Sequence, residues 1–199
     1  MTTLKSVLFD FGGVLAEEGF REGLKAVARK NSLDPDRFFE QAREIIYRTG
    51  YVTGHSDEAS YWNTLRQETG ISGSDAELRD EILRRFIPRA RMLEHAEKIR
   101  YYGIITAILS DQTNWLDELN QRDHFYHYFD YVFNSFTLKK SKRDPSIFLD
   151  TAAHIGAKPE EMLFIDDDEG HIQRAASVGC RTIHFKSIDD FEEKIKQFI

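Results

Sequence analysis

Residues 6–15 read SVLFDFGGVL, a mainly apolar run that stops at Asp10 and is followed by a pair of glycines. Four later runs rich in Val, Ile, Leu and Phe stop just as abruptly, and the residues that end them are Ser110, Asn134, Asp166 and Lys186. Continuous hydrophobicity without alternation is typical of strands that are covered on both faces. The five runs therefore predict a mostly parallel, Rossmann-like sheet.

Helical patterns separate the later runs. Apolar residues recur at helical spacing over 92–99 and over 147–155, and a glycine follows each pattern, at Gly103 or Gly156. A third apolar stripe, over 188–198, predicts a closing helix. Strands that alternate with helices are joined by right-handed crossovers, so we predict an α/β fold, a three-layer sandwich.

The segment between the first two strands is too long for a simple crossover and shows no strand pattern. Asp34–Pro35 and Ser56 are candidate helix starts, and Ser74–Glu77 has the spacing of a capping box. We therefore predict a small helical subdomain inserted after the first strand. The predicted division is a helical subdomain over 16–88 and a core made of 1–15 and 89–199.

The composition is that of an acidic globular protein. Apolar residues make up 41% of the 199 residues, and 27 basic against 34 acidic residues give a net charge of −7. This charge argues against nucleic acid or an anionic membrane as a partner. The single cysteine, Cys180, excludes an intrachain disulfide, and no apolar run is long enough to span a bilayer. Because the N-terminus lacks a secretory pattern, we expect a cytoplasmic protein, whose oligomeric state the sequence leaves open.

The polar residues at the strand ends form a chemically coherent set, although they lie far apart in the sequence. In an open parallel sheet, ligands bind at the carboxyl ends of the strands. Asp10 and the acidic run Asp166–Asp168 can share Mg²⁺, which prefers hard oxygen ligands, while Ser110 and Lys142 can hold a dianionic group. A carboxylate beside Mg²⁺ and a lysine stays ionised and can attack phosphorus, which gives an aspartyl phosphate.

Four motifs, in this order, resemble those of the haloacid dehalogenase (HAD) superfamily, and the resemblance extends over the whole chain. They are Phe9–Leu15, Leu109–Asp111, Lys142–Phe148 and Phe164–Asp167. The helical stretch after the first motif is similar to the small helical cap of the family's first subclass. The glycine pair after Asp10 is similar to that of a branch of phosphatases that act on sugar phosphates. The resemblance implies a HAD-like fold and a hydrolase.

The resemblance also implies catalytic and phosphate-binding roles. Asp10 takes the position of the nucleophile, Ser110 would bind the transferred phosphoryl group, and Lys142 would neutralise both phosphate and nucleophile. Asp111, next to Ser110, joins the implied phosphate site, although the family often has Asn there. Its carboxylate adds negative charge near the phosphate unless it is paired or points away.

Mg²⁺ is the cofactor that the resemblance implies. Its ligands would be Asp10, the backbone carbonyl of Gly12 and Asp167, with Asp166 either a ligand or a partner through water. His171 stands where the fourth motif often ends in Asp or Asn.

A further departure from the family concerns proton transfer. Many phosphatases of the family carry a second Asp, as general acid and base, at the position of Gly12. Without it the leaving oxygen departs unprotonated or takes its proton from elsewhere, and a leaving group of low pKa suffers least. Glu17, His55 and Glu58 are candidate substitutes, and the sequence does not choose among them.

The sequence thus supports one main hypothesis and two alternatives. The main hypothesis is a Mg²⁺-dependent phosphoric monoester phosphatase that acts on small phosphorylated metabolites. One alternative is a hydrolytic dehalogenase on the same scaffold, which needs no metal. The other is a catalytically weak binding or regulatory protein, which the departures at Gly12, Asp111 and His171 motivate. Specificity would reside in the helical subdomain, where five side chains either face the substrate or pack the helices together: Tyr47, Tyr51, His55, Tyr61 and Trp62.

Overall fold

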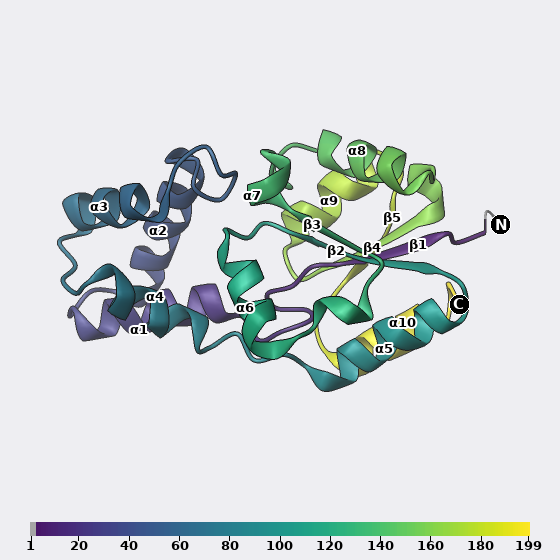
Figure 1. The fold of residues 1–199 in the computed structure, drawn as a ribbon, viewed down its shortest axis with the longest axis horizontal. Helices are drawn as coiled ribbons and strands as arrows, with labels where there is room; N and C mark the ends of the chain where they lie inside the picture. Colours follow the sequence, from purple (N-terminus) through teal and green to yellow (C-terminus); the bar gives the residue numbers. More distant parts are fainter. Residues whose placement is uncertain (1–2) are drawn as a thin grey trace.

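The computed structural model describes residues 3–199, and its centre is a five-stranded sheet flanked by helices (Figure 1). The strands are β1 (Ser6–Phe9), β2 (Ile105–Ser110), β3 (Tyr131–Asn134), β4 (Met162–Asp166) and β5 (Arg181–His184). Their order in the sheet is β3-β2-β1-β4-β5, and every neighbouring pair is parallel. The predicted α/β fold is therefore confirmed, with β1 between β2 and β4.

Alternate residues of the central strand belong to two separate cores. Val7 and Phe9 pack on one face of the sheet and Leu8 packs on the other. The covering helices are α5 (Ala90–Tyr101) and α10 (Ile188–Ile195) on the first face, and α8 (Ser146–Ile155) and α9 (Glu169–Ser177) on the second. All three strand side chains are fully buried. The run is apolar without alternation because helices exclude water from both faces.

A group of four helices lies between β1 and β2 in the sequence and beyond the carboxyl ends of the strands in space (Figure 1). They are α1 (Gly19–Lys30), α2 (Pro35–Arg48), α3 (Glu58–Thr69) and α4 (Asp75–Leu83). Asp34 caps α2, and Ser74 with Glu77 forms the capping box of α4, as predicted. The cap predicted for α3, Ser56, is wrong by one residue, because the cap is Asp57, whose carboxylate accepts a hydrogen bond from the first turn.

Aromatic packing joins this four-helix group to the α/β core. The remaining short elements are α6 (Trp115–Asp123), α7 (Ser135–Leu138) and the 3-10 turns η1 (Tyr126–Tyr128) and η2 (Pro159–Glu161). The ring centroid of Trp115 lies 5.8 Å from that of Tyr51 and 6.0 Å from that of Trp62. Tyr61 is buried beside Tyr51 and Trp62, so these three side chains pack the helices, whereas His55 is exposed.

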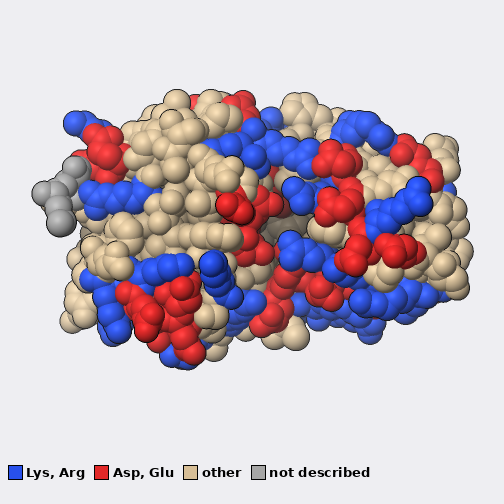
Figure 2. Space-filling model, turned by 180° about the vertical axis from the view of Figure 1, so that it is seen from behind, with Lys and Arg blue, Asp and Glu red and all other residues tan. Residues whose placement is uncertain are grey.

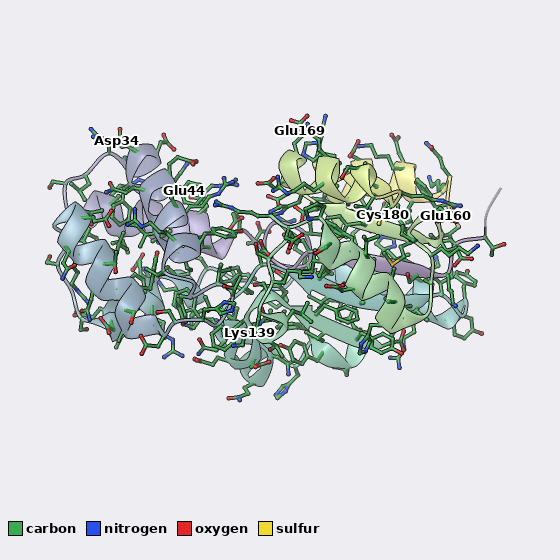
Figure 3. The ribbon with its side chains drawn as sticks, turned by 90° about the horizontal axis from the view of Figure 1, so that it is seen from above. Asp34, Glu44, Lys139, Glu160, Glu169 and Cys180 are labelled. Atoms are coloured by element: carbon green, nitrogen blue, oxygen red, sulfur yellow. The ribbon has the colours of Figure 1, made fainter. Side chains whose placement is uncertain are left out.

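Ion pairs and hydrogen bonds also cross from the four-helix group to the core. Glu44, on the side of α2 that faces the core in Figure 3, pairs with Arg143 at 2.5 Å. Lys139 Nζ donates a hydrogen bond to the Gly54 carbonyl at 2.7 Å. Figure 2 shows a hollow at this junction, with acidic and basic side chains around it.

Within residues 3–199, the structure has no helix with both the length and the apolar character needed to cross a membrane.

Candidate active site

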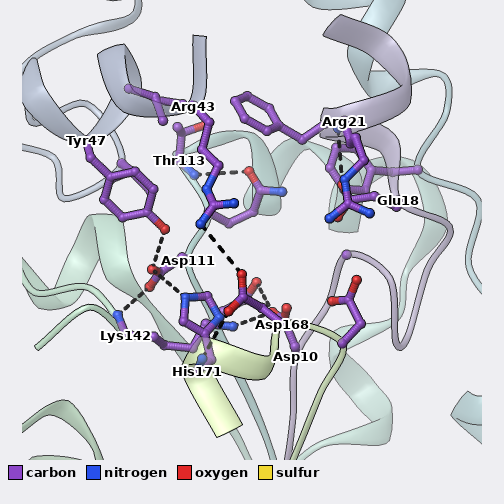
Figure 4. Close-up of a pocket in the computed structure, with 18 of the residues that line it drawn as sticks. Asp10, Glu18, Arg21, Arg43, Tyr47, Asp111, Thr113, Lys142, Asp168 and His171 are labelled. Atoms are coloured by element: carbon purple, nitrogen blue, oxygen red, sulfur yellow. Dashed lines mark hydrogen bonds and ion pairs between the residues drawn. The ribbon is translucent and has the colours of Figure 1, made fainter. Parts of the chain in front are cut away.

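The carboxyl end of the sheet brings four polar residues into contact. Asp10 follows β1, Ser110 and Asp166 end the two neighbouring strands, and Lys142 comes from the turn before α8. Ser110 Oγ donates a hydrogen bond to Asp10 Oδ1 at 2.7 Å. Lys142 Nζ lies 2.9 Å from Asp10 Oδ1 and 2.6 Å from Asp166 Oδ2. The strand order therefore assembles one site from residues that are distant in the sequence (Figure 4).

Asp10 has one oxygen held in place and one oxygen free. Its Oδ1 is held by Ser110 Oγ, by Lys142 Nζ and by the backbone N–H of Phe11, which donates at 2.7 Å. No group within residues 3–199 donates a hydrogen bond to Oδ2. Burial and the charge of the Asp166 carboxylate raise the pKa of Asp10 to about 6, although Lys142 acts in the opposite direction. The carboxylate is thus oriented and still ionised at neutral pH, as a nucleophile must be.

Lys142 is completely buried between two carboxylates. Burial alone disfavours its charge, but Asp10 and Asp166 outweigh burial, so the pKa of Lys142 is raised above its ordinary value. Burial likewise favours neutral Asp166, but Lys142 and His171 outweigh that effect and lower the pKa of Asp166 to about 2. His171 Nδ1 lies 3.2 Å from Asp166 Oδ2. His171 therefore helps to hold Asp166 ionised.

A third carboxylate completes a group with the chemistry of a divalent cation site. Asp10, Asp166 and Asp167 each offer one oxygen, and these atoms lie within 4.8 Å of one another. Burial and the charges of Asp10, Glu18 and Asp166 raise the pKa of Asp167 to about 8. In the part of the chain that the structure describes, nothing donates a hydrogen bond to the Asp167 carboxylate. Clustered hard oxygens whose negative charges disfavour one another suit a divalent cation such as Mg²⁺.

The glycine pair after Asp10 makes room for this group. Gly13 has a φ of 81°, and a Cβ there would lie 2.5 Å from Asp167 Cγ, which is closer than atoms tolerate. A Cβ at Gly12 would lie 3.2 Å from Phe86 Cε1 and 3.8 Å from Glu18 Oε1. The Glu18 carboxylate therefore borders the space that a longer side chain at position 12 would enter. The Gly12 carbonyl as a metal ligand stays a prediction.

Asp111 carries a charge that an asparagine would lack, and the structure pairs that charge with donors. The Tyr47 hydroxyl of α2 donates to Asp111 Oδ2 at 2.7 Å, and the backbone N–H of Lys142 donates to Oδ1 at 2.8 Å. The guanidinium carbon of Arg143 lies 3.5 Å from the centroid of the Tyr47 ring. Asp111 thus connects α2 to the core at the pocket wall, and its role in binding phosphate stays a prediction.

The pocket over Asp10 is also lined from the side of the four-helix group (Figure 4). The lining residues from that side are Glu18, Phe20, Arg21, Phe39, Arg43, Ile46, Tyr47 and Val52. Of these, the sequence singled out only Tyr47. Glu18 is the N-cap of α1 and accepts the Arg21 backbone N–H at 3.2 Å, so a helix-start pattern is the one signal that marks it. The arginines carry no comparable signal.

The three residues considered as substitutes for the general acid lie elsewhere. Glu17 forms an ion pair with Arg89 at 3.0 Å. Glu58 accepts the indole N–H groups of two buried tryptophans, at 2.9 and 3.0 Å. His55 is exposed. None of the three lines the pocket that residues 3–199 form around Asp10.

Comparison with known proteins gives a consistent result. A family model described as haloacid dehalogenase-like hydrolase matches residues 4–179. A HAD family enzyme from Bacteroides thetaiotaomicron is 22% identical, with a TM-score of 0.78 over 98% of this chain and 99% of its own. A further structure of that enzyme is a complex with magnesium and inorganic phosphate. At this identity the likeness shows the fold alone.

Two curated relatives match at similar identity. Bifunctional epoxide hydrolase 2 from Sus scrofa is 24% identical over 94% of this chain and 37% of its own length. Flavin mononucleotide hydrolase 1 from Arabidopsis thaliana is 25% identical over 41% of this chain and 33% of its own length. The chain therefore spans about a third of the length of these two relatives.

Proposed function

This chain belongs to the haloacid dehalogenase-like hydrolases, and from that membership we propose a Mg²⁺-dependent phosphatase that hydrolyses small phosphorylated metabolites. The observation that carries the proposal is the environment of Asp10. One carboxylate oxygen is fixed by Ser110 and Lys142, and the other has no donor within residues 3–199. The same carboxylate lies beside Asp166 and Asp167, which suit a divalent cation.

In the proposed first step, Asp10 Oδ2 attacks the phosphorus of a phosphomonoester. A new P–O bond forms while the bond to the leaving alcohol oxygen breaks, and that oxygen keeps the bonding electron pair. Ser110 and Lys142 hold the nucleophile in place. The positive charge of Lys142 also offsets the charge on the phosphoryl oxygens, with Asp111 beside it in the phosphate site. The product of this step is an aspartyl phosphate.

In the second step, water attacks the phosphorus of the aspartyl phosphate, and the P–O bond to Asp10 breaks with its electron pair returning to the carboxylate. The proton of the water passes to Glu18, the group to which we assign proton transfer below, and inorganic phosphate and free Asp10 are released. Asp10, Asp166 and Asp167, with the carbonyl of Gly12, are the groups that would hold Mg²⁺. When bound there, Mg²⁺ would act as a Lewis acid and neutralise phosphate charge.

We assign α1–α4 the role of a helical cap, with its boundaries at 16–88, as in the first subclass of the family. Two contacts of α2 support this assignment, because Tyr47 attaches it to Asp111, which lines the pocket, and Glu44 pairs with Arg143, the residue after Lys142. A cap held there excludes bulk water from the aspartyl phosphate. The glycine pair, which is similar to that of the branch that acts on sugar phosphates, supports a relation to that branch.

Phosphate release with and without metal tests the proposed function. We expect the purified protein to release phosphate from 4-nitrophenyl phosphate and from members of a panel of sugar and organic-acid phosphates when Mg²⁺ is present. Excess EDTA should abolish release, and added Mg²⁺ should restore it, because the three carboxylates would repel the phosphate without a cation. The measurement is the initial rate of phosphate formation.

The same assay separates the two alternatives. Halide release from 2-halo acids that persists in EDTA would identify a dehalogenase and contradict the proposal. Absence of turnover across the panel, together with binding of Mg²⁺ or phosphate in calorimetry, would identify a catalytically weak binding protein. In either case, phosphatase activity would be the wrong assignment.

We assign proton transfer to the leaving group to Glu18, because its carboxylate borders the space next to Gly12 and faces the pocket. Replacing Glu18 with glutamine should lower kcat/KM for alkyl phosphates by about 100-fold, since a positioned general acid typically contributes that much or more. The loss should be much smaller for 4-nitrophenyl phosphate, whose leaving group needs no proton. Glu17→Gln is the matched control, because Glu17 pairs with Arg89 and does not line the pocket. Equal losses for both kinds of leaving group would exclude Glu18 as the acid.

A further inference from the structure

Two arginines line the pocket on the side opposite the carboxylates. Arg21 belongs to α1 and Arg43 to α2, and both side chains are half-buried in the same pocket as Asp10. Figure 4 shows both guanidinium groups directed from the helices toward the floor of the pocket. The motif residues that bind the phosphoryl group in the proposed mechanism lie on that floor. The arginines therefore supply positive charge that this mechanism does not use.

Neither guanidinium has a close anionic partner in the described residues, because Arg21 has none and the partner of Arg43 is distant. Within residues 3–199, the Arg21 guanidinium has no hydrogen-bond acceptor and no carboxylate partner, and its contact is with the Phe39 ring, 5.4 Å from the ring centroid. Arg43 Nη2 lies 3.7 Å from Asp168 Oδ2. This separation is well beyond the roughly 2.7–2.9 Å of a charge-assisted hydrogen bond. Asp168 already accepts the His171 backbone N–H as the cap of α9.

The surroundings of the arginines indicate what kind of ligand fits them. Besides Glu18 and Tyr47, the other lining residues of this side are apolar, and they are Phe20, Phe39, Ile46 and Val52. A guanidinium beside apolar side chains and without a close anionic partner favours an anion that can accept two parallel hydrogen bonds. Carboxylates and phosphates have that geometry, whereas a neutral sugar hydroxyl does not.

We propose that the substrate carries a second anionic group, a carboxylate or a second phosphate, on the part of the molecule that leaves with the alcohol oxygen, and that Arg21 and Arg43 bind it. This inference rests on the proposed phosphatase function and narrows its substrate class to phosphorylated acids and bisphosphates. The floor of the pocket receives the phosphoryl group, and the arginines select the remainder of the molecule.

Matched substrates test the inference. They are short alkyl phosphates of equal chain length that end in a carboxylate, in a second phosphate or in a neutral carboxamide. We expect the wild-type kcat/KM to be at least about 10-fold higher for an anionic end than for the carboxamide. The anionic end with the larger advantage identifies which of the two groups the natural substrate carries. Equal rates for all three ends would overturn the inference while leaving phosphatase activity in place.

Variants of the arginines test which residues carry the preference. Arg21→Gln and Arg43→Gln should each reduce the ratio of anionic to carboxamide kcat/KM by about 10-fold, and Arg43→Lys, which keeps the charge but loses the planar fork, by less. Arg48→Gln is the matched control on α2, because Arg48 pairs with Glu68 outside the pocket and should leave the ratio unchanged. If the arginines only balance the charge of nearby acids, the kcat/KM values for all three substrates will change by the same factor, and the inference fails.

A binding measurement separates failure of this inference from failure of the proposed function. The Asp10→Asn protein, with Mg²⁺ present, can be titrated calorimetrically with the same three alkyl phosphates. Tighter binding of the anionic ends, lost on adding Arg43→Gln, supports the inference even if no compound is hydrolysed by the wild type. Equal affinities for the three compounds would contradict it.

Discussion

Replacing Asp10 with asparagine is expected to reduce Mg²⁺-dependent phosphate release by about 1,000-fold or more. The amide has nearly the size of the carboxylate and fits the same buried position. Its oxygen carries no negative charge, however, and is a poor nucleophile toward phosphorus. Ser110 and Lys142 stay in place, so the loss reports on the nucleophile itself. The measurement is the initial rate of phosphate release from 4-nitrophenyl phosphate at saturating Mg²⁺.

The control for this prediction is Asp150→Asn, the same chemical change at an exposed residue of α8 that pairs with Lys140. It should keep the wild-type rate. Burial raises the pKa of Asp10 to about 6. Keeping this carboxylate ionised in neutral buffer therefore lowers the free energy of unfolding. The metal-free Asp10→Asn protein should therefore melt at or above the wild-type temperature. A folded variant that keeps more than about a tenth of the rate would show that Asp10 is not the nucleophile.

The sheet could be predicted because its signal is local. Each central strand is covered on both faces, so its apolar run has sharp ends at Asp10, Ser110 and Asp166. The edge strand β5 ends one residue before its apolar run, which stops at Lys186. Its ladder with β4 starts at Arg181 and ends at His184, and Phe185 packs in the core beyond it. That boundary depends on pairing between distant segments, which a local pattern does not contain.

The same distinction separates the site residues that could be predicted from those that could not. Asp10, Ser110 and Asp166 follow from strand ends, because parallel strands place their carboxyl ends together. Glu18 was missed in favour of its neighbour Glu17. Glu18 is the N-cap of α1 and Glu17 precedes it, and their side chains point to different places: Glu18 to the pocket and Glu17 to the Arg89 ion pair. Only the packing of α1 on the core fixes that choice.

Tertiary contacts decide whether the negative charge of Asp111 is paired, which the sequence leaves open. Its carboxylate lies near the proposed phosphate site, where an unpaired charge would repel the substrate. Tyr47, more than sixty positions away, donates to one oxygen, and the backbone of Lys142 donates to the other. The pairing needs α2 to rest on the core. Neither the spacing nor the composition of either segment contains that information.

Replacing Lys142 with methionine is expected to lower the free energy of unfolding of the metal-free protein by about 3–5 kcal/mol. Methionine nearly fills the volume, but the change leaves Asp10 and Asp166 buried without their shared cation. Each carboxyl must then either take up a proton or stay charged in a largely buried site without a cation beside it. Both outcomes weaken the folded state. Urea denaturation at neutral pH with EDTA measures the difference.

The comparison with Lys140→Met makes this prediction specific to the site. Lys140 is two positions away and pairs with the exposed Asp150. Replacing Lys140 should therefore lower the free energy of unfolding by no more than about 0.5 kcal/mol. Mg²⁺ should restore part of the stability of the Lys142→Met protein, because a cation held by Asp10, Asp166 and Asp167 offsets the same charges. The free energy of unfolding could instead fall by the same small amount in both variants, or Mg²⁺ could have no effect on the Lys142→Met protein. Either result would mean that the buried lysine does not balance the carboxylates. The electrostatic basis for holding phosphate at this site would then be wrong.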